Sequence, residues 1–313
     1  MKIFRNLDEI RDIKNAVVTT GSFDGVHVGH KVIINRLRKL AKNIGGESVL
    51  ITFHPHPRLV LYPETDGKDL LLINSQREKI DLLRKAGLDN LVIINFTKEF
   101  AQTTSMQFVN EILLDRIHAK KIIVGFNHFF GHNKEGNYNS LHQSAEEKGF
   151  EVEEIPEQDI QNETVSSTKI RKALLEGDIQ RANAYLDHQY IMLGELTHGS
   201  EVCKKIGLAC MSIFIDENIK LIPPEGVYAI SLKTKDEYFR GMLNIRNAAT
   251  SHQPQHSNTC IDMHLFDYNS NLIGKTAEVF FHKRIRDLAN FKSIDEMKIQ
   301  LTHDKVMIDD LIY

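Results

Sequence analysis

Short apolar, β-branched segments alternate with amphipathic helical patterns along the first 186 residues. Five of these segments are expected to be strands: residues 16–20, 48–53, 91–94, 121–124 and 151–155. Runs of this kind are typical of parallel strands that are buried on both faces. Strands that alternate with helices form a parallel sheet with helices on both faces. The sequence therefore predicts a doubly wound, Rossmann-like α/β domain over residues 1–186.

The helical segments of this half carry their own start and stop signals. The pattern over residues 75–89 opens with Ser75 and Glu78 in the spacing of a capping box, and Gly87 near its end suits a helix C-cap. Two further segments have the three-to-four-residue period of amphipathic helices: residues 30–43 and 105–117. We expect a helix in each of these segments.

From residue 187 onward the pattern changes to strands without helices between them. Five stretches resemble strands separated by turn residues: 190–199, 206–215, 226–234, 237–245 and 259–268. Only residues 293–312, near the end of the chain, have a helical pattern. This half is predicted to be an antiparallel sheet or small β-barrel with a C-terminal helix, forming a second domain over residues 187–313.

The composition of the chain limits the classes of binding partner and the cellular compartment that we expect. The net charge of −3 provides no strongly basic surface for nucleic acid, and 42% hydrophobic residues suit an ordinary globular core. Three cysteines without a C-x-x-C pair argue against a disulfide framework. The first 15 residues have no apolar signal core, and no run approaches the roughly 20 apolar residues of a membrane span. We expect a cytoplasmic protein with small-molecule substrates. The sequence gives no indication of its oligomeric state.

A glycine- and histidine-rich segment, GSFDGVHVGH at residues 21–30, directly follows the first predicted strand. Glycines allow the backbone to turn tightly and to approach a ligand, and the N-terminus of the next helix favours phosphate. Two imidazoles three positions apart, His27 and His30, can then donate to one phosphate group. The alternatives are a glycine-rich turn with two structural histidines or, less favoured, a metal site. Asp24 is equally well explained as a loop-orienting residue or as a turn aspartate.

A second segment, VSSTKIRKAL at residues 165–174, follows the last predicted strand of the same domain. Its hydroxyl groups can cap the next helix and donate to phosphate. Arg171 can bind a phosphate with two parallel hydrogen bonds. Alone, this segment is best explained as a capped amphipathic helix. Together with residues 21–30, it predicts that one triphosphate is held between the two segments.

The pattern G-x-F-D-G-x-H-x-G-H with a downstream S-S-T-x-I-R resembles the nucleotidyltransferase domain of the bifunctional bacterial riboflavin kinase/FAD synthetase family. Three further segments are similar to the same family: FHPHPR (53–58), VGFNHFFGHNKEGN (124–137) and GFEVEEIP (149–156). The resemblance continues in order through the whole chain.

The resemblance implies that the first domain forms FAD and pyrophosphate from FMN and ATP, with Mg²⁺ screening the triphosphate. It implies catalytic roles for His27, His30 and Arg171. The ATP-binding residues would be Gly21, Ser22, Phe23, Asp24, Gly29, His30, Ser166, Ser167, Thr168 and Arg171. On the flavin side it implies His56, Asn127 and Phe130, although Phe129 stands where arginine is common in the family. No residue is assigned as a metal ligand.

Residues 187–313 resemble the riboflavin kinase module, but several of its catalytic positions differ. The P-T-A-N segment that holds Mg²⁺ and ATP phosphates is replaced by residues 209–212, Ala-Cys-Met-Ser. Arg246 stands where glycine is usual, and Asp262 stands where the general base is a glutamate. Arg286 is expected on the flavin side. We therefore expect a weak or inactive kinase module that retains its fold.

Three alternatives to an FMN adenylyltransferase with a degraded kinase module stay open at this stage. One is a fully bifunctional enzyme that converts riboflavin to FMN and FMN to FAD. Another is a non-catalytic flavin- or nucleotide-binding regulator, against which both intact phosphate-type segments argue. The third is a related transferase that acts on another phosphorylated acceptor.

Overall fold

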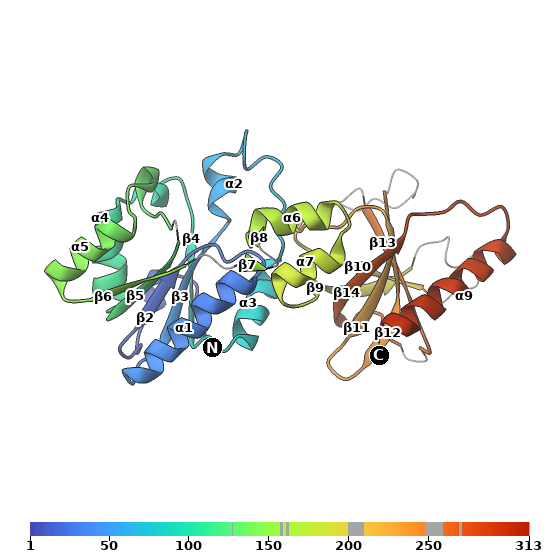
Figure 1. Cartoon of the computed structure of the whole chain (residues 1–313), viewed down its shortest axis with the longest axis horizontal. Coiled ribbons are helices and arrows are strands. Elements are labelled where there is room, and N and C mark those ends of the chain that lie inside the picture. Colours follow the sequence, from blue (N-terminus) through green and yellow to red (C-terminus); the bar gives the residue numbers. More distant parts are fainter. Residues whose placement is uncertain are drawn as a thin grey trace. The chain divides into compact units, whose positions relative to one another are not determined.

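The structure is a computed structural model that describes residues 1–126, 128–156, 159–160, 163–199, 210–247, 259–268 and 271–312. The chain divides into two compact units (Figure 1). The first unit contains residues 1–70 and 79–166, and the second contains residues 71–78 and 167–313. A short segment from the first half of the sequence therefore belongs to the second unit.

The first unit is built on a six-stranded parallel sheet of order β1-β4-β3-β2-β5-β6. Its strands are β1 (Lys2–Phe4), β2 (Val17–Thr20), β3 (Ser48–His54), β4 (Asn90–Asn95), β5 (Lys121–Gly125) and β6 (Glu151–Ile155). All five expected strands are present, within two residues at each end. A sixth strand, β1, was not expected: it is a three-residue edge strand that pairs with β4.

Helices and short turns connect these strands. They are η1 (Leu7–Glu9), α1 (Val28–Asn43), α2 (Pro57–Leu61), α3 (Gln76–Lys85), η2 (Phe100–Gln102), α4 (Ser105–Gln107), η3 (Phe108–Arg116), η4 (His132–Lys134) and α5 (Tyr138–Lys148). The helix expected over 105–117 is one turn of α-helix, α4, continued by the π-helix η3. A short hairpin, β7 (Asp159–Ile160) and β8 (Glu163–Thr164), follows β6.

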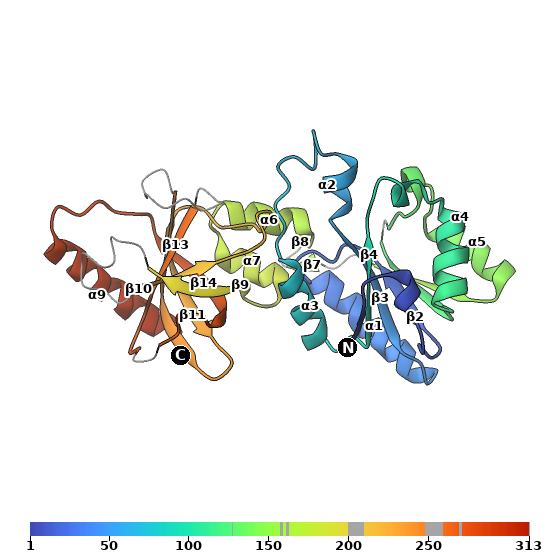
Figure 2. The same cartoon turned by 180° about the vertical axis from the view of Figure 1, so that it is seen from behind.

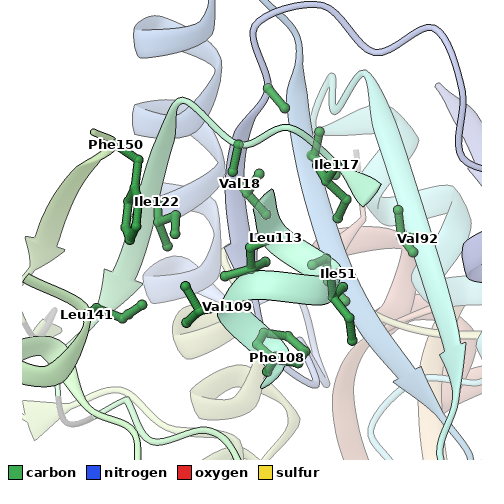
Figure 3. Close-up of a cluster of buried hydrophobic side chains, with 14 of the residues drawn as sticks. Val18, Ile51, Val92, Phe108, Val109, Leu113, Ile117, Ile122, Leu141 and Phe150 are labelled. Carbon is green, nitrogen blue, oxygen red and sulfur yellow. The ribbon is translucent and has the colours of Figure 1, made fainter. Parts of the chain in front are cut away.

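Both faces of the sheet are covered, as a doubly wound fold requires. Alternate strand residues belong to different core clusters, because successive side chains of a strand point to opposite faces. Val17, Leu50 and Leu91 pack in one cluster with side chains of α1 and α3. Their neighbours Val18, Ile51 and Val92 pack in the other cluster with side chains of η3 and α5 (Figure 3). The predicted Rossmann-like fold is confirmed.

The second unit contains a closed six-stranded antiparallel barrel of order β10-β13-β12-β11-β14-β9. Its elements are α6 (Ser167–Leu175), α7 (Ile179–Leu186), β9 (Tyr190–His198), β10 (Cys210–Phe214), β11 (Gly226–Lys233), β12 (Tyr238–Asn247), β13 (Thr259–Leu265), β14 (Thr276–Arg286) and α9 (Ile294–Leu311). The C-terminal helix α9 packs along the barrel (Figure 2), with Ile308 in a cluster with Val227 and Met242. The predicted barrel and C-terminal helix are confirmed, although β14 was not among the expected strands.

Segment 71–78 joins the second unit through a buried ion pair. Ser75 and Glu78 form the predicted capping box: the Ser75 amide donates to Glu78 Oε2 at 2.9 Å and the Glu78 amide donates to Ser75 Oγ at 3.2 Å. The same carboxylate accepts from Lys220 Nζ at 2.7 Å, and both side chains have no exposed surface. Lys220 Nζ also donates to the carbonyls of Ile73 and Ile191, so that its charge is fully enclosed by acceptors.

None of the helices that the structure describes is both long enough and apolar enough to cross a membrane.

Candidate active site

The chain turns sharply after β2, at the glycine-rich segment. Gly25 has a φ of 94°, and two larger residues, Phe23 and Val26, also have positive φ values of 47° and 43°. Such values are costly for residues with a Cβ and persist only where the surroundings hold them. The side chains of Phe23 and Val26 are buried in the core, 3% and 1% exposed. Their burial fixes the unusual shape of the loop.

The loop leads into the N-terminus of α1, which begins at Val28, two residues earlier than expected. His27 is the N-cap and has extended backbone angles, and its side chain makes no capping hydrogen bond. The amides of the first helical turn have no acceptor within the helix, because the first four N–H groups of any α-helix lack one. Val28, Gly29 and His30 therefore present amides, with the positive end of the helix dipole, to an anion.

His27 and His30 form a ring stack at this helix start. Their ring centroids are 3.7 Å apart, and the ring of Phe23 stacks on the other face of His30 at 4.3 Å. The pKa of His30 is well below its ordinary value because the ring is buried, and because His27 and Lys79 oppose a further charge. The lowered pKa favours the uncharged imidazole, whose one N–H can donate a hydrogen bond.

A cavity of about 520 Å³ opens at the carboxyl ends of β2, β3, β5 and β6, where ligands bind in open α/β sheets. We call it the first cavity. Eight of the sequence-predicted site residues line it: Gly21, Ser22, Phe23, His27, Gly29, His30, His56 and Ser166. Asp24 is buried, 1% exposed, and is not among the lining residues. The structure thus brings both phosphate-type segments to one cavity through Ser166.

The remaining members of the second segment belong to α6 in the second unit. Ser167 is the first residue of that helix, and Thr168 is exposed. Arg171 Nε donates to the carbonyl of Leu71 at 2.8 Å, within the same unit. The predicted convergence of Ser167, Thr168 and Arg171 on ATP stays a prediction.

A second cavity, of about 380 Å³, adjoins the first cavity within the first unit. Seven phenylalanine and tyrosine side chains line it: Phe53, Tyr62, Phe96, Phe100, Phe108, Phe129 and Phe130. The predicted residue Phe130 packs beside Phe108 with ring centroids 5.9 Å apart. Five residues line both cavities: Thr20, Phe53, Pro57, His128 and Phe129. A ligand with a flat aromatic group and a phosphate can occupy both cavities together.

His128 is a site residue that the sequence reasoning missed. It lines both cavities, and its ring stacks on Phe130 with centroids 6.2 Å apart. Burial lowers the pKa of His128 to about 4. Among the described residues, no hydrogen-bond partner takes its buried Nε2. The available signal was a histidine directly followed by two phenylalanines, at residues 128–130.

The other predicted flavin-side residues of this unit have different surroundings. His56 is the N-cap of α2, and its Nδ1 accepts from the Arg58 amide at 3.2 Å. Phe129 is 50% exposed, so it is not a core residue. Asn127 lies outside the described residues.

In the barrel, Asp262 is buried and held by side chains of three strands. Ser212 Oγ on β10 donates to its Oδ1 at 2.6 Å, and Arg246 on β12 forms an ion pair with its Oδ2. The Cys260 thiol, whose pKa is raised by burial and by the Asp262 charge, lies 3.6 Å from the same oxygen. The candidate base is thus engaged by neighbours. Residues 203–209 of the altered kinase segment lie outside the described residues.

Arg286 ends β14 and binds the second unit's own helix. Its guanidinium donates to both carboxylate oxygens of Asp304 on α9, at 2.6 to 3.1 Å, and Asp304 has no exposed surface. This pair attaches α9 to the barrel. The flavin role expected for Arg286 stays a prediction.

The parallel sheet with its phosphate-type cavity and the closed barrel define a nucleotidyltransferase-like domain joined to a flavokinase-type domain. The FAD synthetase family matches residues 9–169, and the riboflavin kinase family matches residues 186–312. The chain belongs to the family of bifunctional riboflavin kinase/FMN adenylyltransferases. Enzymes of this family use ATP and Mg²⁺ with riboflavin or FMN, and they yield FAD.

Individual relatives support this assignment over nearly the whole chain. The Bacillus subtilis bifunctional enzyme is 30% identical over 93% of this chain and 90% of its own length. The Buchnera aphidicola (subsp. Acyrthosiphon pisum) enzyme is 30% identical over 98% of this chain and 97% of its own. A Streptococcus pneumoniae crystal structure titled a macrolide-efflux protein covers 98% of each chain, with a TM-score of 0.87 and 26% identity.

Proposed function

We propose that residues 1–186 of this chain transfer AMP from ATP to FMN, forming FAD and releasing pyrophosphate. The observation that carries the proposal is the pair of adjoining cavities with five shared lining residues. One cavity offers imidazoles and helix amides for phosphates, and the other offers aromatic walls for a flavin ring. Such an arrangement suits a reaction that joins two nucleotides through their phosphates.

In the proposed step an oxygen of the FMN phosphate attacks the α-phosphorus of ATP. A new P–O bond forms as the bond between the α-phosphorus and the bridging oxygen breaks, and that oxygen leaves with pyrophosphate. FMN already carries an anionic phosphate, so no protein base is needed to generate the nucleophile. Catalysis then consists of positioning the two phosphates and stabilising the charge that develops between them.

Each proposed role follows from the local chemistry. Neutral His30 donates a hydrogen bond to a phosphate oxygen, and His27 stacks against it and keeps the ring in place. The amides at the start of α1 receive the ATP phosphates. Ser167, Thr168 and Arg171 would bind the departing pyrophosphate, since hydroxyl and guanidinium groups donate to phosphate oxygens.

The side chains of the described residues are compatible with a Mg²⁺ ion that binds together with the nucleotide. Among them no cluster of three His, Cys, Asp or Glu side chains could enclose a metal ion. Mg²⁺ commonly keeps several waters and binds mainly through substrate phosphates. The hydroxyl groups of Ser22 and Ser166 in the first cavity are the oxygen donors that would hold it there. When bound, the ion would neutralise part of the negative charge of the triphosphate.

For residues 187–313 we propose a weak or inactive riboflavin kinase. The Arg246 ion pair and the Ser212 hydrogen bond support the proposal, because both occupy the carboxylate of Asp262. A base engaged by a guanidinium is poorly disposed to take a proton from a substrate hydroxyl. The alternative is a fully bifunctional enzyme, which the names of the relatives favour.

One assay tests both parts of the proposal. The purified chain with ATP and Mg²⁺ receives FMN in one reaction and riboflavin in another, and the flavins are separated by chromatography. FAD from FMN, with little product from riboflavin, is the expected result. Formation of FMN and FAD from riboflavin at comparable rates supports the bifunctional alternative. Absence of turnover with FMN contradicts the proposed adenylyl transfer.

A further inference from the structure

Lys79 is a buried lysine whose ammonium group contacts the glycine-rich loop from within the first unit. Its side chain is 3% exposed, and Nζ donates to the carbonyl oxygen of Ser22 at 3.0 Å. Thr52 Oγ1 on β3 donates to the same oxygen at 3.2 Å. One carbonyl of the loop is therefore held by two donors from distant parts of the chain, and one of these donors is charged.

These two bonds fix the orientation of the peptide between Ser22 and Phe23. In a trans peptide the C=O and the N–H point in opposite directions. The Phe23 amide therefore points away from Lys79 and Thr52. No acceptor among the described residues takes this N–H, and both Ser22 and Phe23 line the first cavity. The amide is therefore left without a protein acceptor in the described part of the chain, at a residue that lines the cavity.

The charge of Lys79 also acts on the histidines around the loop. It contributes to the lowered pKa of His30, after burial and His27, and to the lowered pKa of His54, after burial. The positive charge of Lys79 thus acts on His30, which lines the first cavity. A charge at that range also attracts an anionic ligand bound in this cavity.

We propose that Lys79 is a positioning residue for the ATP phosphates: it holds the Ser22 carbonyl so that the Phe23 amide faces the first cavity, and its charge favours an anion there. The inference rests on the proposed function of the first cavity as the ATP site. Thr52 is the second, uncharged support of the same carbonyl.

Substitutions at Lys79 separate the hydrogen bond from the charge. Lys79→Met removes both, whereas Lys79→Gln keeps a donor without the charge. We expect kcat/KM for ATP to fall about tenfold to a hundredfold in Lys79→Met and by less in Lys79→Gln, as losing a support of a phosphate donor implies. KM for FMN should stay within about twofold. Lys85→Met, at an exposed position on the same helix, is the matched control.

Thr52→Val tests the orientation of the peptide independently of charge. We expect a smaller loss in kcat/KM for ATP. Combined with Lys79→Met, the loss should be smaller than the product of the two single effects, because both act through one carbonyl. Strictly multiplicative losses would overturn the shared-carbonyl mechanism.

Equilibrium binding of a fluorescent ATP analogue without flavin distinguishes this inference from the proposed reaction. If the wild-type chain binds the analogue but forms no FAD, the reaction fails while the role of Lys79 is judged by binding alone. Weaker binding in Lys79→Met, with wild-type circular dichroism, supports the inference. Unchanged binding and kcat/KM, or equal losses for ATP and FMN, overturn it. If Lys79→Met does not fold, unchanged binding in both Lys79→Gln and Thr52→Val overturns it as well.

Discussion

The rings of His27 and His30 stack 3.7 Å apart at the start of α1, with Phe23 on the other face of His30. Replacing His30 with alanine removes this ring and the hydrogen bond to phosphate that we propose for it. We expect His30→Ala to lower kcat for FAD formation by about a hundredfold to a thousandfold, with FMN affinity nearly unchanged. Steady-state kinetics and a flavin-fluorescence titration measure the two effects.

His142→Ala provides the control, since that histidine is exposed on α5. Near-normal turnover in a folded His30→Ala variant would remove the role proposed for this ring.

Phe130 contributes to the wall of the second cavity, beside Phe108 and His128. Phe130→Ala removes an aromatic contact of the proposed flavin site, which is worth on the order of 1 kcal/mol or more. KM for FMN should rise about tenfold, while KM for ATP changes by less than about twofold. Phe214→Ala, at an exposed position on the barrel, serves as control. An equal rise in both KM values would contradict the proposal that the second cavity binds the flavin.

We expect the stability of the first unit to depend on pH through His128. Its folded pKa of about 4 is below the ordinary value of 6.5, so below pH 6.5 the unfolded chain binds a proton that the folded chain does not. Stability is therefore lost as the pH falls from 6.5 towards 4, by up to about 3 kcal/mol for this group. His128→Phe removes the effect, and denaturant unfolding at pH 7 and pH 4.5 measures it. An equal loss in both proteins would refute the assignment.

The buried pair of Lys220 and Glu78 connects segment 71–78 to the barrel. Lys220→Met leaves a carboxylate buried without its cation and should destabilise the second unit by about 3–5 kcal/mol. Adding Glu78→Gln should recover part of this loss, because no uncompensated charge is then buried. Lys275→Met is the matched control: it breaks an exposed pair with Glu237 and should cost less than about 1 kcal/mol. Denaturant unfolding that finds the two lysine variants equally stable would contradict the account.

Patterns that are local in sequence predicted much of the fold. Strands β2, β3, β4 and β5 contain short continuous apolar runs, and β6 begins and ends at the expected residues. β14 was missed, although Ala277, Val279 and Phe281 alternate as buried residues of a strand should. Phe280, which lies between two of these buried residues, and the charged residues Lys283, Arg284 and Arg286 interrupt the simple apolar–polar alternation. The three residues of β1 form a strand only because β4 lies beside them, which no local pattern indicates.

The same distinction holds for the site. The glycine-rich segment was identified because its histidines and glycines lie within ten residues. Lys79 and Ser22 are 57 positions apart, and only the folded chain brings Nζ to the Ser22 carbonyl. Similarly, the Arg246 ion pair of Asp262 depends on the register of β12 and β13. Contacts between distant strands and helices were therefore beyond the reach of sequence patterns.

The most direct test of the proposed adenylyl transfer follows the phosphorus atoms of ATP. Purified chain, FMN and Mg²⁺ are incubated with ATP labelled at the α-phosphorus or at the γ-phosphorus, and the flavin products are separated. We expect label from the α position in FAD, and label from the γ position only in pyrophosphate. A flavin labelled only from the γ position, or no labelled flavin from either ATP, would contradict the proposed reaction.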